Sequence, residues 1–245
     1  MTMSEVLRVA GLRKSFGVIR VADDLDFAIT LGECLGVIGP NGAGKSSVLN
    51  LIVGLIRPDG GSISLDGRDI THVPAHRRAR LGVGRAFQIP QPFPHLTAYE
   101  NVLVAATYGG GLHGAAASDW AMDVLSRTSL AAKADRIAGA LPLIDRKRLE
   151  FAKALASKPR LILLDEIAAG LTEPEVERLI EIIAGVKADY AMIWIEHIPH
   201  ALRAVADRIL VLNFGRKVLD GLPAEVMESR TVKEIYMGLT ADDVA

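Results

Sequence analysis

The chain of 245 residues has little of several features that would narrow its function at once. It carries a single cysteine, its aromatic residues make up only 5% of the sequence, and its 28 basic and 29 acidic residues leave a net charge of −1. Such a balance argues against a protein that grips nucleic acid or an anionic membrane mainly through bulk charge. The longest uncharged stretch, residues 101–118, is interrupted by three consecutive glycines and a histidine, so it does not predict a membrane-spanning helix.

The lone cysteine excludes an intrachain disulfide, which fits a reducing compartment. Cys34 lies in the apolar segment ECLGVIG, with no base or cation close by in the sequence, so we expect a buried thiol rather than a reactive one. The first residues, MTMSEVLRV, include Glu5 and lack the apolar core of a signal peptide. We therefore expect a cytoplasmic protein that serves a membrane, if at all, through a partner.

Half of the residues are hydrophobic, enough for a sizeable core, and their pattern changes along the chain. Alternating apolar residues predict half-buried strands over residues 20–29 and 62–70, the second with a hairpin turn at Asp66-Gly67. Short apolar runs typical of buried strands follow in CLGVIG, RLILLDE, YAMIWIEH and DRILVLNFG. Residues 91–150 are rich in Ala, Leu and Gly and predict helices. The alternation predicts a mostly parallel α/β sheet with short antiparallel strands at the start and a helical insert.

Two helices are marked by their end signals. Residues 45–55, KSSVLNLIVGL, predict a helix closed by Gly54. Residues 172–187, TEPEVERLIEIIAGVK, predict a helix that begins with a capping box formed by Thr172 and Glu175.

A glycine-rich segment between the third strand and the first helix carries the strongest chemical signal. GPNGAGKS matches the P-loop pattern G-x-x-x-x-G-K-[ST], whose backbone N–H groups turn inward around phosphates. Lys45 would reach the β- and γ-phosphates, and the Ser46 hydroxyl would coordinate Mg²⁺. A dinucleotide-binding fold is disfavoured, because the glycines are spaced G-x-x-G-x-G. The expected phosphate-binding residues are Gly39, Pro40, Asn41, Gly42, Ala43, Gly44, Lys45, Ser46 and Ser47.

Two adjacent acids end a later buried strand, LILLDE. A P-loop needs an acid at the end of a neighbouring parallel strand to hold the Mg²⁺ shell, and Asp165 suits that role. Glu166 follows it and is placed to polarise a water in line with the γ-phosphate. A solvated turn is the alternative reading, but beside a P-loop the pair predicts nucleotide hydrolysis.

With these motifs the chain resembles an ATPase subunit of ABC transporters, and the resemblance covers nearly all of it. Phe16, in LRKSFG, resembles the aromatic residue that stacks on adenine. Gln88, in GRAFQ, resembles the Q-loop glutamine, which contacts the metal or the water. Thr172 falls in the D-loop, and His197, ending WIEH, resembles the switch histidine that senses the γ-phosphate. The resemblance implies ATP and Mg²⁺ as cofactors, with Glu166, His197 and Gln88 catalytic.

The resemblance also implies the fold: an α/β P-loop NTPase with a mostly parallel core sheet, an N-terminal antiparallel β subdomain and a helical insert. A single ABC ATPase domain would span residues 1–245. Its parts would be the first portion of the nucleotide-binding core over about 1–90, a helical subdomain over about 91–158, and the rest of the core with C-terminal helices over about 159–245.

Within the family, GRAFQ with FPHLTAYENVLVA, AAGLTEPE and the tail GRKVLDGLPAEV are most similar to ATPases of branched-chain amino-acid importers. That subgroup also serves other small organic solutes. The implied partners are membrane permease subunits, a second ATPase subunit and, indirectly, a periplasmic binding protein, at the cytoplasmic face of the inner membrane; no nucleic acid is expected. Ile167 stands where the family usually has proline after the catalytic acid.

The main departure is the signature motif, L-S-G-G-Q in the family, where this chain has Leu141-Pro-Leu-Ile-Asp145. In the family the serine and glycine amides contact the γ-phosphate held by the opposite subunit. Pro142 has no N–H, and Leu143 and Ile144 bring bulk where the backbone must approach closely. Asp145 would place a negative charge near a phosphate, or would cap the following helix. We expect a heterodimer with an ATPase that has an intact signature, rather than a homodimer.

Two other functions stay open. The chain could be a regulatory half-subunit with little turnover of its own. A soluble ABC ATPase that acts on ribosomes or DNA is less favoured, because such proteins usually show tandem domains or a coiled-coil insert, and neither fits in 245 residues.

Three weaker signals favour ordinary structural roles. His197 and His200 could suggest a metal site, but Pro199 between them spoils a common helical face. Trp194 lies in an apolar strand, so we expect it in the core. A basic cluster predicts a solvated helix face, with permease or lipid headgroups as the alternative contact; its members are Arg77, Arg78, Arg80 and Arg85.

Overall fold

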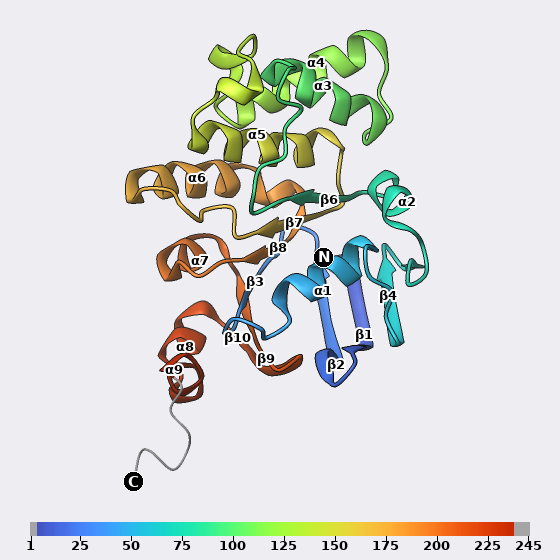
Figure 1. Ribbon diagram of the computed structural model, residues 1–245, viewed down its shortest axis with the longest axis vertical. Coiled ribbons are helices and arrows are strands. Elements are labelled where there is room, and N and C mark those ends of the chain that lie inside the picture. Colours follow the sequence, from blue (N-terminus) through green and yellow to red (C-terminus); the bar gives the residue numbers. More distant parts are fainter. Residues whose placement is uncertain (1–3, 238–245) are drawn as a thin grey trace.

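The computed structural model describes residues 4–237, which form two sheets and a helical layer (Figure 1). The strands are β1 (Glu5–Phe16), β2 (Ile19–Thr30), β3 (Cys34–Ile38), β4 (Gly60–Leu65), β5 (Arg68–Asp69), β6 (Val83–Ala86), β7 (Leu161–Asp165), β8 (Ala191–Ile195), β9 (Arg208–Asn213) and β10 (Arg216–Gly221). The α-helices are α1 (Lys45–Val53), α2 (Ala75–Arg80), α3 (Ala98–Tyr108), α4 (Gly114–Arg127), α5 (Leu143–Ala156), α6 (Glu173–Val186), α7 (Pro199–Val205), α8 (Pro223–Glu228) and α9 (Arg230–Met237). Short 3₁₀ turns cover Ala131–Lys133, Ala138–Ala140 and Lys187–Asp189.

The larger sheet has the order β10-β9-β3-β8-β7-β6, and only β10 runs antiparallel to its neighbour. The smaller sheet, β2-β1-β4-β5, is antiparallel throughout. The predicted fold class is thereby confirmed. The prediction of short strands at the start is wrong, since β1 and β2 have 12 residues each.

The local end signals act as expected. Asp66 and Gly67 both adopt positive φ, 46° and 75°, which closes the β4–β5 hairpin in the twist that a two-residue turn needs. Helix α1 ends at Gly54, also at positive φ. The side chains of Thr172 and Glu175 form the capping box of α6.

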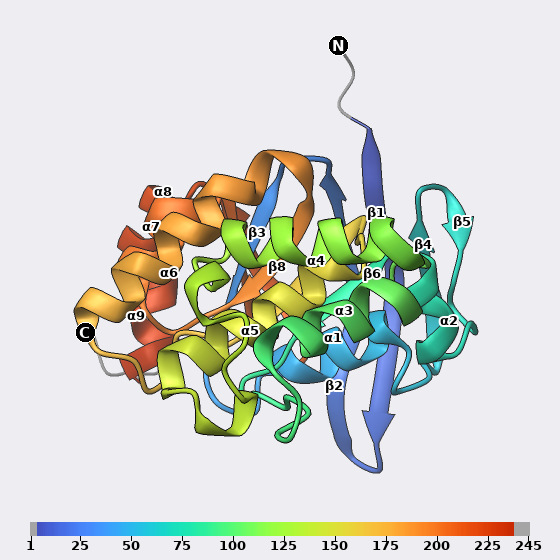
Figure 2. The same ribbon diagram turned by 90° about the horizontal axis from the view of Figure 1, so that it is seen from above.

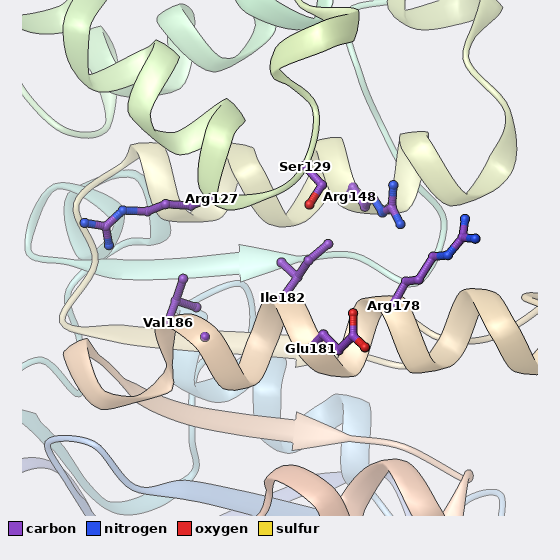
Figure 3. A pocket seen from close by; sticks show the side chains of 8 residues that line it. Arg127, Ser129, Arg148, Arg178, Glu181, Ile182 and Val186 are labelled. Atoms are coloured by element: carbon purple, nitrogen blue, oxygen red, sulfur yellow. The ribbon is translucent and has the colours of Figure 1, made fainter.

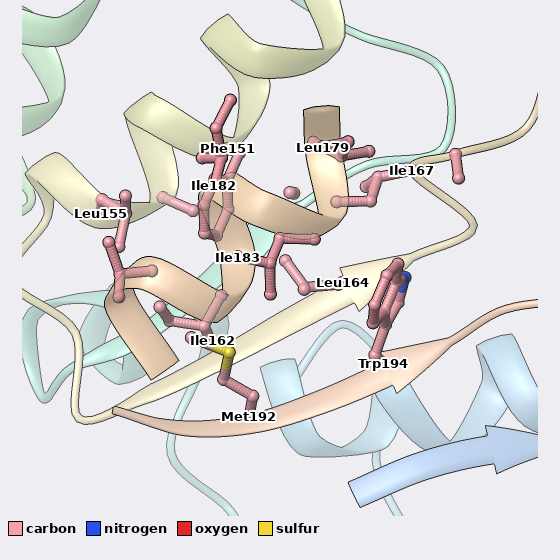
Figure 4. Packing of buried hydrophobic residues seen from close by; sticks show 14 of the residues in the cluster. Phe151, Leu155, Ile162, Leu164, Ile167, Leu179, Ile182, Ile183, Met192 and Trp194 are labelled. Atoms are coloured by element: carbon pink, nitrogen blue, oxygen red, sulfur yellow. The ribbon is translucent and has the colours of Figure 1, made fainter. Parts of the chain in front are cut away.

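Two apolar cores lie on the two faces of the six-stranded sheet. One joins the sheet to α1 and the antiparallel sheet. The other joins it to α6 and the helical layer of α3, α4 and α5, which lies in front of the central strands in Figure 2. Trp194 is fully buried there beside Leu164 and Ile183, as Figure 4 shows, which confirms the expectation of a core residue.

The topology brings several chain segments to one edge of the larger sheet. Strands β3, β6, β7 and β8 run parallel, so their carboxyl ends meet at the same edge. The P-loop follows β3, Gln88 follows β6, Glu166 follows β7 and His197 follows β8. The residues expected to act on a nucleotide therefore converge although they lie far apart in sequence.

The basic cluster is not one solvated face, and that prediction is wrong. Arg78 is buried and donates to the carbonyls of Leu51 and Ile52, which end α1. Arg85 lies on β6 and turns into the protein. Of the four arginines, only Arg77 and Arg80 are exposed, both on α2. The difference arises because Arg78 supplies hydrogen bonds to the last carbonyls of α1, which a helix leaves incompletely satisfied.

The environment of Cys34 predicts an inert thiol. The residue is fully buried on β3, and burial raises its pKa to about 12. Because the thiolate is the reactive species, a thiol reagent at pH 8 should modify the folded protein at least ~100-fold more slowly than the protein in guanidinium chloride. Absorbance of the released thiol chromophore measures both rates, and equal rates would contradict the buried placement.

Candidate nucleotide site

The P-loop packs closely between β2 and the end of β9 with its following turn. A Cβ on Gly39 would lie 2.1 Å from the carbonyl oxygen of Leu212, and one on Gly44 would lie 2.3 Å from that of Val21. The Gly215 N–H in the β9–β10 turn donates to the carbonyl of Ala43 at 2.9 Å. Only glycine fits at the two contact points, so the spacing of the motif follows from backbone packing as well as from phosphate binding.

Lys45 lies at the start of α1 with its amine inside the loop. Its Nζ donates to the carbonyl oxygens of Gly39 at 2.7 Å and Pro40 at 3.1 Å. Burial lowers the pKa of the amine, and the charges of Glu166 and Asp165 oppose that shift. The amine is thus held where an anion entering the loop could take over from the two carbonyls.

A cleft of about 290 Å³ opens in front of the loop. Asn41, Ser46 and Ser47 line it from the loop side, and Glu166 lines it from the end of β7. Ile19 and Val21 of β2 complete the wall. The sequence does not mark these two residues as part of a site, because a strand pattern does not say which loop the strand packs against.

Glu166 is the centre of a hydrogen-bonded cluster at this edge. Gln88 Nε2 donates to Glu166 Oε2 at 2.7 Å, and His197 Nε2 lies 2.9 Å from Glu166 Oε1. The backbone of Glu166 has φ 47°, unusual for a residue with a side chain, and its N–H donates to the Ile195 carbonyl. Two of the residues predicted to be catalytic, Gln88 and His197, therefore both contact the third, Glu166.

A buried acid behind the cluster was not singled out by the sequence analysis. Glu196 accepts the N–H of Ala168 at 2.9 Å and that of His197 at 3.0 Å. Burial raises its pKa, although the two N–H groups oppose the shift. Its carboxylate joins the segment after Glu166 to the backbone of His197. The sequence WIEH contained the residue, but its orientation into the protein depends on how β8 packs.

Asp165 ends β7 and is nearly buried. Arg85 Nη2 donates to Asp165 Oδ2 at 2.6 Å, and Arg85 Nη1 donates to Asn50 Oδ1, also at 2.6 Å. Hard oxygen donors of the kind Mg²⁺ prefers lie at this edge, on Ser46, Gln88 and Asp165. The Gln88 amide uses its nitrogen for Glu166, which leaves its oxygen for another partner. The donor chemistry therefore fits a magnesium ion.

Phe16 stands at the end of β1 with half of its surface exposed. Its ring lies 5.2 Å from Lys14 Nζ, and it pairs with Ile19, which lines the cleft. Phe16 is thus next to the cleft wall rather than in the core. Its role in stacking on adenine stays a prediction.

The signature segment is built differently from either expectation. Helix α5 begins at Leu143 with Pro142 as its N-cap, so Asp145 does not cap it. Asp145 is 1% exposed and pairs with Lys133 and, at 3.5 Å, with Arg148 Nη1. Its charge therefore turns into the helical layer and not towards a phosphate of another subunit.

Two further residues discussed above, Thr172 and His200, lie apart from the cluster. Thr172 caps α6, and His200 Nε2 lies 3.4 Å from Glu177 Oε1. Among residues 4–237, no group of three His, Cys, Asp or Glu side chains could hold a metal ion.

A second hollow, of about 560 Å³, is lined by residues of the helical layer and of α6 (Figure 3). Three arginines line it, but Arg127 pairs with Asp123 and Asp189, and Arg148 faces Asp145. Most of its positive charge is already balanced, and it contains none of the P-loop residues.

Comparison with known proteins accounts for this geometry. A family model described as ABC transporter matches residues 22–169, more than half of the chain. The chain belongs to the ABC transporter family of ATP-binding proteins. It is 34% identical to the high-affinity branched-chain amino acid transport ATP-binding protein BraF of Pseudomonas aeruginosa, over 95% of this chain and 98% of that one. It is 35% identical to the lipopolysaccharide export system ATP-binding protein LptB of Acidithiobacillus ferridurans, over 96% and 98% of the two chains.

Solved structures agree with that assignment. The ADP conformation of an ATP-binding cassette of an ABC transporter superposes with a TM-score of 0.86 at 27% identity, covering 96% of this chain and 99% of that one. The chain is therefore an ATPase of the ABC type, as its motifs predicted.

Substitutions at Glu166 and Lys45 should affect different steps, ATP hydrolysis and ATP binding. Glu166→Gln keeps the shape of the side chain but removes the carboxylate, so ATP binding should persist while turnover falls at least ~100-fold. Lys45→Ala removes the buried amine from the loop, so ATP affinity itself should fall. Equilibrium binding of a fluorescent ATP analogue and a phosphate-release assay, made with the proper partner subunit, measure the two quantities. Normal turnover by Glu166→Gln would contradict the assignment of the base.

Proposed function

We propose that this chain hydrolyses ATP to energise an ABC importer for branched-chain amino acids or a similar small organic solute. The observation that carries the hydrolytic part is the contact of Glu166 with Gln88 and His197 beside the P-loop cleft. Several relatives named for high-affinity branched-chain amino acid transport, BraF and LivG among them, support the choice of import and of solute.

Each residue of the edge has a role in this proposal. The P-loop amides and Lys45 bind the phosphates, and Phe16 stacks on the adenine. Ser46, Gln88 and Asp165 would hold Mg²⁺, which when bound neutralises phosphate charge. Glu166 orients the attacking water, and its contact with His197 links the water to the residue that would sense the γ-phosphate.

The implied partners follow from the same proposal. The chain would act beside membrane permease subunits at the cytoplasmic face of the inner membrane, with a periplasmic binding protein delivering the solute on the other side. Among the described residues, no helix is both long and apolar enough to cross a bilayer. Coupling would then go through contacts with the permease.

Export is the second candidate function, because LptB relatives are as similar in sequence as BraF. Reconstitution of the chain with the permease proteins encoded by neighbouring genes distinguishes import from export. For an importer, a binding protein loaded with leucine should stimulate ATP hydrolysis several-fold over the unloaded binding protein. Phosphate release in proteoliposomes measures the effect. Stimulation by lipopolysaccharide and not by the loaded binding protein would favour export.

We further propose that the chain pairs with a different ATPase. Its own nucleotide-facing half is complete, whereas the opposite half lacks the groups that would contact a partner's nucleotide. Pro142 has no N–H to donate, and the Leu143 side chain is 38% exposed where a small residue would let two backbones meet. A heterodimer would contain one competent site and one weak site. A low-turnover regulatory half is the alternative form of the same asymmetry.

The asymmetric pair has a direct test. The isolated chain should hydrolyse ATP slowly, and a partner ATPase with an intact signature should raise the rate by at least ~10-fold, since charge-assisted hydrogen bonds to the γ-phosphate are restored. Pro142→Ser combined with Leu143→Gly and Ile144→Gly should raise the activity of the chain alone. These changes leave Asp145 in place, because it is buried between two cations.

Phosphate release is measured for the chain alone, for the chain with the permease, and for the chain with the candidate second ATPase. Full-speed hydrolysis by the chain alone would overturn the heterodimer, as would a transporter with two copies of it that turns over normally.

A further inference from the structure

Arg85 links three parts of the nucleotide edge. It lies on β6, and its two terminal nitrogens bind Asn50 of α1 and Asp165 of β7, each at 2.6 Å. The guanidinium also stacks on the ring of Phe87, with 4.6 Å between its carbon and the ring centroid. The side chains of Arg85 and Asp165 are each only 9% exposed, so the pair is held away from solvent.

A buried ion pair of this kind adds little to stability, because both charges lose their hydration. It does fix geometry: one terminal nitrogen of the planar guanidinium donates to Asp165 Oδ2 while the other donates to Asn50, so the arginine is held from both sides. Arg85 Nε is buried and has no hydrogen-bond partner among the described residues, so the two terminal nitrogens and the Phe87 ring hold the group. Asp165 Oδ2 accepts a hydrogen bond from Arg85, and no other described residue hydrogen-bonds to this carboxylate.

We propose that Arg85 is the positioning residue for Asp165, with Asn50 anchoring the arginine. This inference rests on the proposed role of Asp165 towards Mg²⁺. Arg85 holds Oδ2 through one hydrogen bond, and Oδ1 has no hydrogen-bond partner among the described residues, so Oδ1 is left for the shell of the ion. Partners behind a metal-binding side chain tune metal affinity in the same way in other sites.

The same contact joins the Asp165 carboxylate to the segment that leads to Gln88. Arg85 and Gln88 are three residues apart on the chain, and the Gln88 carbonyl accepts a hydrogen bond from Lys147 of α5. A displacement of this segment by the helical layer would therefore move the anchor of Asp165.

Magnesium dependence of ATP affinity tests the proposal. In a Glu166→Gln background that prevents turnover, ATP binding is measured by equilibrium fluorescence in EDTA and across a Mg²⁺ titration. Arg85→Lys keeps the charge but loses the fork, so the Mg²⁺ concentration for half-maximal effect should rise about 10-fold. Asn50→Ala leaves Asp165 untouched and should give a smaller rise. ATP affinity in EDTA should stay within about twofold for both, which a general loss of structure would not allow.

Arg160→Lys is the matched control, because it makes the same change in an exposed Arg–Asp pair, with Asp66. It should leave the Mg²⁺ titration unchanged. An unchanged titration in both Arg85→Lys and Asn50→Ala would overturn the positioning role, and so would a lowered requirement, which would mean that Arg85 competes with the ion. If the protein with Arg85 and Asn50 intact binds ATP without any effect of Mg²⁺, the proposed metal role of Asp165 fails first, and this inference with it.

Discussion

The parallel arrangement of β3, β6, β7 and β8 is the constraint on which the site depends. Because these strands end at one edge, the P-loop and three short connections can meet around the Glu166 carboxylate. The contacts of Glu166 with Gln88 and His197 join all three connections directly, and Glu196 joins the backbones of the connections that follow β7 and β8. Glu166 itself adopts positive φ, so this convergence holds a backbone conformation that an isolated turn would rarely keep.

Buried charge is concentrated behind this edge, and each charged group is compensated. Lys45 donates to carbonyls of its own loop, and Asp165 pairs with Arg85. Glu196 accepts hydrogen bonds from two backbone N–H groups. Burial lowers the pKa of the Lys147 amine, which donates to the carbonyl of Gln88. Such groups add little stability compared with apolar packing, so their presence here reflects the needs of a charged ligand and of fixed geometry.

Features set by neighbouring residues were predictable from the sequence, and features set by packing were not. The Asp66-Gly67 turn, the capping box at Thr172 and the P-loop each follow from a few adjacent residues, and the structure has the turn and the cap as predicted. Arg85 was assigned to a solvated cluster because its neighbours in sequence are basic. Its partners come from α1 and β7, and no local pattern marks that contact.

The signature segment illustrates the same limit with a functional consequence. From sequence alone, Asp145 could face a phosphate or cap a helix, and both ideas assume that its side chain points outward. In the structure it is enclosed with Lys133 and Arg148, so the start of α5 is anchored within the helical layer. What remains at the surface is a proline without an N–H and an exposed leucine. The proposal of an asymmetric pair therefore depends on this exposed proline and leucine, and not on the charge of Asp145.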